Sequence, residues 1–272
     1  IWVQVPRTLC MHWSGRLSTG VGAKDMMLHM IGRFGMNGGQ YQAVEFAGEA
    51  VMALSMPERM TLSNMSAEMG AQAGLIAADE TTVAHLRQCG VSEDRLQDAL
   101  QWRGDAGAQQ ERFDFDAGSL SPQVAAPHSP ANVQPVGALH EVAPTIAYIG
   151  ACTGAKLEDL RAAASVLRGH KVASGVQLIV APASAREQAQ AEREGTMQVL
   201  RDAGASVLGN SCGACAGYGA TFGEGATVIS STARNFKGRM GPASVQVYLA
   251  SPWTVAASAL RGRIADPREV LA

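Results

Sequence analysis

Apolar residues recur every three or four positions through much of the first hundred residues, a spacing that places them on one side of a helix. Glycine and proline separate these stretches, and Pro57 suits the first turn of a helix. This part of the chain is therefore predicted to be mostly helical. The predicted helices are residues 23–34, 42–54, 57–76, 82–88 and 93–102.

From residue 145 onward, short apolar runs alternate with longer helical patterns. The predicted strands are residues 145–151, 176–182, 205–209, 227–230 and 246–251. The predicted helices between and after them are residues 156–169, 186–204 and 253–262. Such alternation is typical of a largely parallel sheet with helices on its faces, so we predict an α/β fold.

The segment before residue 144 is rich in proline and has no clear period. Segments of this kind usually connect domains. We therefore expect one domain at residues 1–110, a linker at residues 111–143 and a second domain at residues 144–272.

Composition narrows the class of protein. The 272 residues suffice for two domains, and 22 Lys and Arg nearly balance 24 Asp and Glu. This balance argues against nucleic acid and against an anionic membrane surface as partners. No apolar run reaches the roughly 18–20 residues of a membrane helix, and no secretory signal is visible. The first residue, Ile1, lies in an apolar run that resembles the interior of a longer protein.

Cysteine usage favours a reducing compartment, because five cysteines are an odd number and too few for a disulfide framework. We therefore expect a cytoplasmic protein. Three of the cysteines follow predicted strands within turns of glycine and alanine. Cys152 lies in ACTGAK, and Cys212 and Cys215 lie in CGAC. Ligand sites in α/β sheets collect at the carboxyl ends of strands, so the three thiols are expected at one edge of the sheet.

Several kinds of chemistry use such thiols. A structural zinc ion usually needs four ligands, a redox pair needs no third cysteine, and a single buried cysteine is most often inert. Inertness explains Cys10 and Cys89 but not three thiols in small-residue turns. An iron–sulfur cluster held by three cysteines has one iron without a protein ligand, which can act as a Lewis acid in dehydration chemistry.

Two arginines follow the predicted strand at residues 227–230, in STARNFKGR. Arg234 and Arg239 are suited to holding carboxylates bidentately, which points to a di- or tricarboxylate substrate. Asn64 and Glu68 lie four residues apart in a predicted helix and so share one of its faces. On the residues alone, Glu68 is more simply interpreted as an exposed helix carboxylate.

These segments together resemble the aconitase superfamily, above all the large subunits of 3-isopropylmalate dehydratase and homoaconitase. The resemblance runs through residues 39–82, 148–169, 212–217, 223–241 and 247–269 in the same order. It implies three-layer α/β/α domains with largely parallel sheets, the first lining the active site and the second carrying the metal ligands. It also implies that Cys152, Cys212 and Cys215 bind a [4Fe–4S] cluster, and that catalytic residues Asn64, Glu68, Arg234 and Arg239 face the substrate.

The chain departs from the family pattern at three points. Ala151 and Gly154 flank Cys152 where the family commonly has Ser and Asn, and Ala233 stands where it commonly has Asn. The N-terminal third of a typical large subunit, which carries catalytic His and Asp residues, is not part of this sequence. The swivel domain, which supplies a serine base and a further arginine, is also absent and is expected as a separate small subunit.

The resemblance therefore implies a hydro-lyase of amino-acid biosynthesis that acts on a hydroxy di- or tricarboxylic acid such as 3-isopropylmalate. Its partners would be the hydroxy-carboxylate substrate, the small swivel subunit and the N-terminal part of the large subunit, without nucleic acid or membrane. The chain alone is expected to be inactive. The alternatives are an aconitase relative that binds RNA when its cluster is lost, and a structural zinc protein. Near-neutral charge argues against the first.

Overall fold

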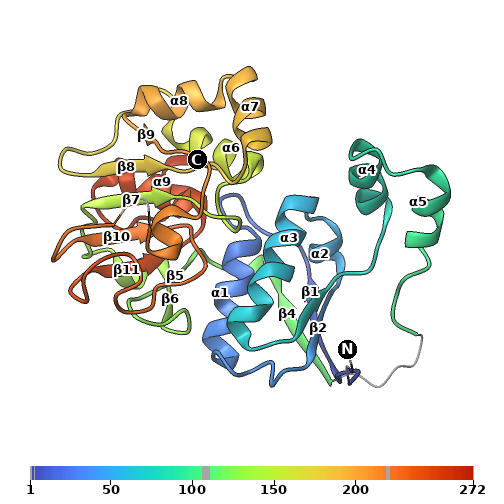
Figure 1. Ribbon diagram of the computed structural model, residues 1–272. Coiled ribbons are helices and arrows are strands. Elements are labelled where there is room, and N and C mark those ends of the chain that lie inside the picture. The colour runs from blue at the N-terminus through green and yellow to red at the C-terminus, as the bar shows by residue number, and fades with distance from the viewer. Residues whose placement is uncertain (1, 3, 106–110, 219–220, 272) are drawn as a thin grey trace.

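The computed structural model describes residues 2, 4–105, 111–218 and 221–271, and its described part contains two sheets with helices packed on them (Figure 1). All strands of the first sheet are parallel, as are most of those of the second. The predicted α/β class with largely parallel sheets is confirmed. No helix of the described residues is both long enough and apolar enough to cross a bilayer.

The first sheet has the strand order β3-β2-β1-β4. Its strands are β1 (Thr8–Ser14), β2 (Ala43–Ala47), β3 (Ala73–Leu75) and β4 (Glu111–Asp116). Helices α1 (Ala23–Phe34) and α3 (Met56–Met65) pack together beside it and share its core. Three further helices, with a 3₁₀ turn, complete this part: α2 (Glu49–Met52), η1 (Ser66–Met69), α4 (Glu80–Gln88) and α5 (Glu93–Ala99). Helices α4 and α5 lie on the side away from the second sheet (Figure 1).

Two of the helices predicted in the first hundred residues were wrong in part. Residues 42–54 form strand β2 and then the short α2, because residues 43–47 pair with β1. The change of direction needs Gly48, whose φ is 99° and where a Cβ would meet the carbonyl oxygen of Trp13 at 2.2 Å. Residues 57–76 are likewise divided into α3, η1 and β3, with Gly70 in the left-handed region ending η1.

Residues 111–143, expected to be a linker, contain strands of both sheets. Strand β4 pairs with β1, whereas β5 (Gln123–Ala125) and β6 (Val133–Pro135) extend the second sheet as antiparallel strands beside β11. Two 3₁₀ turns, η2 (Ala117–Ser119) and η3 (Val136–Leu139), lie in the same segment. The segment is therefore tied to both halves, and the boundaries of the two domains stay a prediction.

The second sheet has seven strands among the described residues, in the order β6-β5-β11-β10-β7-β8-β9. The parallel strands are β7 (Ile146–Ile149), β8 (Gln177–Val180), β9 (Ser206–Val207), β10 (Thr227–Ser230) and β11 (Gln246–Leu249). The helical elements are α6 (Leu157–Leu167), α7 (Ala185–Arg193), α8 (Thr196–Ala203), η4 (Gly213–Ala216), α9 (Pro252–Arg261) and α10 (Arg268–Leu271). The single helix predicted at residues 186–204 is two, because Gly195 adopts φ 82° between them.

The two faces of the second sheet are covered differently. Alternate residues such as Ala147 and Ile149 pack against α6, α8 and α9. Tyr148 and Ile179 belong instead to a core shared with the helices of the first sheet and with loop residues such as Phe222. Helix α1 also contacts β5 and β6, so this core is continuous between the two sheets.

Candidate active site

Three loops meet at the carboxyl edge of the second sheet. The loop after β7 carries Cys152, the loop after β9 carries Cys212 and Cys215, and the loop after β10 carries Arg234. Strands β10, β7, β8 and β9 are neighbours and run parallel, so their carboxyl ends lie on the same side. The structure therefore places the predicted thiols and arginine at one edge, where α/β proteins usually bind ligands.

The turn that carries Cys152 is packed tightly against the end of β10. Ser231 Oγ accepts from the amide of Gly150 at 3.0 Å and donates to the carbonyl of Gly154 at 2.9 Å. A Cβ at Gly154 would meet Ser231 Cβ at 2.4 Å, so a residue with a side chain cannot occupy this backbone position unchanged. Ala151 adopts φ 69°, a strained value for a residue with a side chain. The turn leaves Cys152 exposed.

Cys212 and Cys215 belong to one tight turn. The amide of Cys215 donates to the carbonyl of Cys212 at 2.9 Å, and Gly217 ends η4 in the left-handed region. Cys212 is exposed and Cys215 partly exposed, and both are free thiols. Tyr148 lies beneath this turn, and burial raises the pKa of Tyr148 to about 12. A buried, neutral phenol therefore supports two accessible thiols.

Asn64 and Glu68 both approach this edge from the first sheet's helices. Asn64, near the end of α3, lies with its Nδ2 3.6 Å from the Sγ of Cys152. Glu68 follows in η1 rather than in the same α-helix, because α3 ends at Met65. It is only 4% exposed, and its Oε1 accepts from Nε of Arg234 at 2.6 Å. Glu68 is therefore not the exposed helix carboxylate that its local sequence favours.

The two arginines have different surroundings. The Arg234 side chain is 43% exposed and paired with Glu68. Arg239 is partly buried, and its Nε has no partner among the described residues. The carbonyl of Arg239 lies where a Cβ on Gly217 would meet it at 2.8 Å, so this arginine's backbone packs on the cysteine turn.

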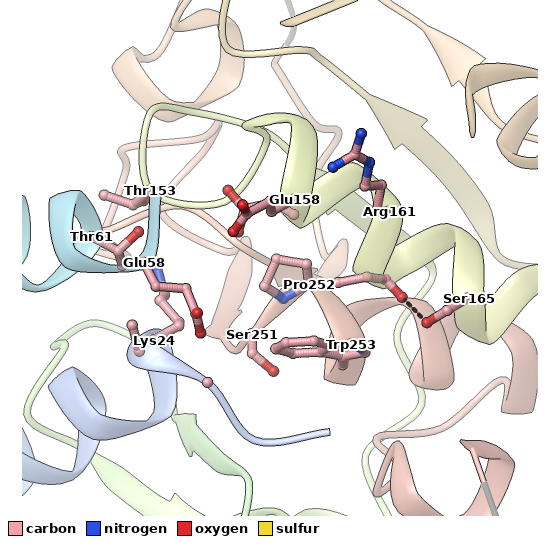
Figure 2. A pocket seen from close by; sticks show the side chains of 14 residues that line it. Lys24, Glu58, Thr61, Thr153, Glu158, Arg161, Ser165, Ser251, Pro252 and Trp253 are labelled. Carbon is pink, nitrogen blue, oxygen red and sulfur yellow. Dashed lines mark hydrogen bonds between the residues drawn. The ribbon is translucent and has the colours of Figure 1, made fainter. Parts of the chain in front are cut away.

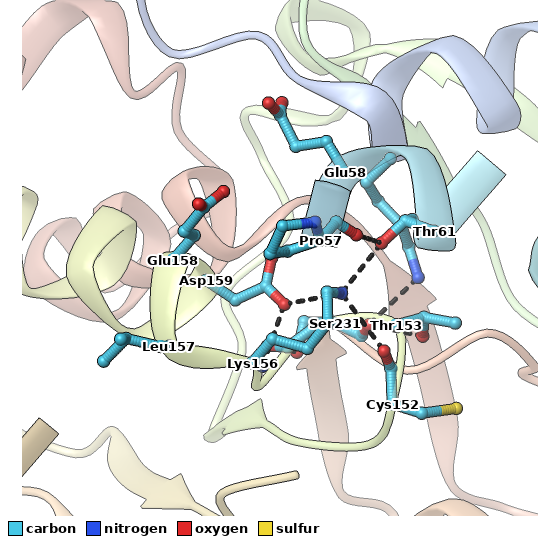
Figure 3. Close-up of polar contacts among 12 residues, drawn as sticks. Pro57, Glu58, Thr61, Cys152, Thr153, Lys156, Leu157, Glu158, Asp159 and Ser231 are labelled. Atoms are coloured by element: carbon cyan, nitrogen blue, oxygen red, sulfur yellow. Dashed lines mark hydrogen bonds and ion pairs between the residues drawn. The ribbon is translucent and has the colours of Figure 1, made fainter. Parts of the chain in front are cut away.

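Two buried lysines at this edge were missed by the sequence analysis, since burial of a lysine leaves no mark in local sequence. Lys156 Nζ donates to Thr61 Oγ1 at 2.8 Å and to the carbonyl of Cys152 at 3.1 Å, and it pairs with Asp159 at 2.9 Å (Figure 3). Lys24 Nζ donates to the carbonyls of Ser231 at 2.9 Å and Thr232 at 2.6 Å. Burial lowers the pKa of Lys24 to about 8.

A cavity of about 390 Å³ lies beside the cysteine edge, where helices α1, α3, α6 and α9 begin (Figure 2). Lys24, Thr61 and Thr153 line it towards the cysteine turn, and Trp253 lines it at α9. Glu58 also lines it, and burial, followed by the neighbouring Glu158, raises the pKa of the Glu58 carboxyl. None of the three edge cysteines lines this cavity, so it is separate from the edge itself.

The thiols at this edge are ligands of the chemical type that an iron–sulfur cluster requires. Three free, accessible thiols are soft ligands, which iron–sulfur clusters prefer. Among the described residues, no three His, Cys, Asp or Glu side chains are grouped closely enough to bind one metal ion. A cluster spreads its cysteine ligands over different irons and does not require convergence on a single ion.

Residues 1–262 match the sequence profile of the aconitase family (aconitate hydratase). The chain belongs to the aconitase family. This aconitase-family chain is 42% identical over 272 residues to the 3-isopropylmalate dehydratase large subunit of Picrophilus torridus. It is 44% identical over 271 residues to the probable methanogen homoaconitase large subunit of Methanosarcina mazei.

The matches span nearly all of this chain but only part of each relative. The aconitase-family chain is covered to 99% in both matches but spans 64% of the Picrophilus protein and 68% of the Methanosarcina protein. Among solved structures, aconitase X of Thermococcus kodakaraensis in its holo-form is similar with a TM-score of 0.44 and 11% identity. That match covers 88% of this chain and 52% of the other.

Proposed function

We propose that this chain is part of the large subunit of an iron–sulfur hydro-lyase that acts on a hydroxy di- or tricarboxylic acid such as 3-isopropylmalate. Membership of the family and the names of its relatives support dehydratase chemistry. The observation that carries the proposal is the single edge of the second sheet whose loops carry Cys152, Cys212, Cys215 and Arg234, and at which Asn64 contacts Cys152 and Glu68 pairs with Arg234.

In this proposal, Cys152, Cys212 and Cys215 hold a [4Fe–4S] cluster. When bound, the cluster supplies a Lewis-acidic iron that polarises the substrate hydroxyl and a carboxylate. Asn64 Nδ2, 3.6 Å from Cys152 Sγ, donates to a ligand sulfur and limits its movement.

Arg234 and Arg239 bind the substrate carboxylates. Glu68 occupies Nε of Arg234, so the two terminal nitrogens of that guanidinium remain for a bidentate carboxylate contact. The same contact fixes the plane of the guanidinium before the substrate arrives. Glu68 therefore uses Oε1 to hold Arg234. Its second oxygen, Oε2, is buried without a partner among the described residues, and in this proposal it accepts a hydrogen bond from the departing water and orients it.

The remaining groups of the reaction belong to partners. The words "large subunit" in the relatives' names support a small subunit, which we propose to be the swivel-domain protein that supplies the base for the α-proton. The acid for the leaving hydroxide is proposed to lie in the N-terminal part of the large subunit, since this chain spans only 64% of the Picrophilus relative. A role in amino-acid biosynthesis, a cytoplasmic location and the absence of nucleic-acid and membrane partners stay predictions.

The test is anaerobic reconstitution of the chain with iron and sulfide. We expect a brown protein with about four irons and four sulfides per chain. Cys152→Ser, Cys212→Ser and Cys215→Ser should each prevent assembly, whereas Cys89→Ser, on the exposed end of α4, and Cys10→Ser should not. Stoichiometric zinc without iron would sink the proposal, and RNA binding at physiological salt would favour the RNA-binding alternative.

A further inference from the structure

Lysine is scarce in this chain, and its distribution is uneven. Of only four lysines, Lys24 and Lys156 are 3% and 8% exposed. Lysine is among the residues least often buried, because an ammonium ion loses hydration in the interior. Both buried lysines reach the loops of the cysteine edge, one from each half of the molecule (Figure 3 shows Lys156).

Lys156 joins helix α3 to the Cys152 turn. Its ammonium has three N–H groups, and three acceptors meet it: Thr61 on α3, the carbonyl of Cys152, and Asp159 on its own helix. Thr61 lies one helical turn before Asn64, the residue that contacts Cys152 Sγ. Lys156 and Asn64 therefore connect the same two elements, one through the backbone of Cys152 and the other through its thiol.

Lys24 joins helix α1 to the loop that carries the arginines. Its ammonium binds the carbonyls of Ser231 and Thr232, and Arg234 follows two residues later. Helix α1 packs against both α3 and η1, and η1 carries Glu68, the partner of Arg234. The loop after β10 is thus bound twice to the same packed helices: by Lys24 of α1, and by Glu68 of η1 through Arg234.

Stability alone does not account for these two charges. Replacing a buried charged group and its partners with apolar residues of similar volume is often neutral or stabilising. Burial lowers the pKa of Lys24, so the charged form of this side chain is costly at this position. What an apolar side chain cannot do is fix the position of two carbonyls with directional bonds.

We propose that Lys24 and Lys156 are positioning residues that fix the arginine loop and the Cys152 turn relative to each other. Lys156 holds the Cys152 turn against α3, and Lys24 holds the Ser231–Arg234 segment against α1. This role rests on the proposed function. Neither lysine is expected to touch the substrate.

The first experiment uses the 272-residue chain without any cluster, so its outcome does not depend on the proposed function. Lys156→Met, Lys24→Met and the control Lys171→Met, whose lysine lies on the exposed surface, are compared by amide hydrogen exchange and mass spectrometry. Lys156→Met should speed exchange in residues 150–156 about tenfold, as expected for loss of one charge-assisted hydrogen bond, and leave residues 231–235 unchanged. Lys24→Met should do the reverse, and Lys171→Met should change neither.

A general structural role would speed exchange in both segments of each variant. Only a positioning role predicts that each variant affects one segment and leaves the other unchanged. Wild-type exchange in both segments of both variants would overturn the proposal. So would equal acceleration of both segments with a common fall in melting temperature, because that would show only global destabilisation.

The second experiment uses the reconstituted chain with its partner subunits. Lys24→Met should raise KM for the hydroxy acid about tenfold with normal iron content, because only the arginine segment is displaced. Lys156→Met should shorten the lifetime of the cluster in air, and Lys156→Arg, which keeps the charge and donors, should restore part of it. A wild-type chain that takes up no iron would contradict the proposed function and leave the exchange test of the two lysines standing. Unchanged KM and cluster lifetime in the Met variants would overturn the positioning role.

Discussion

Arg234 is held by one of its five N–H groups, so its exposed end can act on a second carboxylate. Glu68 binds Nε at 2.6 Å, and the side chain is 43% exposed. Arg234→Lys would keep the charge but lose both this contact geometry and the bidentate fork. We expect a loss of about 2–3 kcal/mol of transition-state stabilisation in the complete enzyme, measured from kcat/KM.

The cluster content of Arg234→Lys should equal that of the wild type, since no cysteine is changed. Arg239→Lys serves as the parallel variant, and a similar loss is expected from it. Wild-type kinetics in both would show that the two arginines do not bind the substrate.

Asp25, beside Lys24 in α1, makes stability depend on pH. Its carboxylate is fully buried and accepts from the amides of Gly22 and Gln123, and burial raises the pKa of Asp25 from 3.8 to about 7. Between these two values the folded chain retains a proton that the unfolded chain has lost. The free energy of unfolding therefore falls as the pH rises from about 4 to about 7, and is level above that.

Urea unfolding of the wild type and of Asp25→Asn at pH 5 and pH 8 measures this contribution. The wild type should lose more stability between the two pH values than the variant, whose side chain does not titrate. An identical pH dependence in the two proteins would show that Asp25 is ionised in the fold throughout this range.

At the scale of elements, the Cys152 turn depends on close contact between two loops. A Cβ on Gly154 would meet Ser231 Cβ and carbonyl oxygen at 2.4 Å. Gly154→Ala should therefore destabilise the chain by about 1–3 kcal/mol in urea unfolding, the usual effect of overpacking. Gly137→Ala is the matched control, because a Cβ there meets nothing within 4 Å. Equal stability of the two variants would mean that the Cys152 turn accommodates a Cβ at residue 154 without strain.

The five parallel strands of the second sheet could be predicted because most of them are short apolar runs with both faces buried, as in β7 and β8, whereas β5 and β6 lie in the segment expected to be a linker. The first sheet could not be. Strand β4 buries only Phe115, and β2 lies in a window whose apolar spacing also suits a helix. In both cases the pairing with β1 decides the structure, and such pairing between distant residues leaves no local signal.

The candidate site was predictable where the sequence itself is unusual. The three cysteines in glycine turns and the arginine-rich loop are recognisable from local sequence alone. The burial of Glu68, Lys24 and Lys156 is not, because it depends on which elements pack against them. Glu68 illustrates the difference: its neighbours in the sequence suggest an exposed helix, whereas in the fold it is buried and pairs with Arg234, 166 residues later in the chain.

At the scale of the whole molecule, the chain spans 64% of the length of the Picrophilus relative. We expect these 272 residues to be inactive alone, even with an intact cluster, because removal of a proton next to a carboxylate needs a positioned base. Glu68 is a poor candidate, since Arg234 already holds it. The measurement is formation of the unsaturated acid by its ultraviolet absorbance, with and without partner subunits. Substantial turnover by the chain alone would instead make Glu68 the base.

The bonds of Lys24 also bear on the order in which the molecule is made. The carbonyls that accept from its ammonium come 207 and 208 residues later in the chain. During synthesis, helix α1 therefore emerges from the ribosome long before its charge can be satisfied, and this end of the helix must stay hydrated until the loop after β10 arrives. The contacts that Lys24 makes with this loop can therefore form only late in translation.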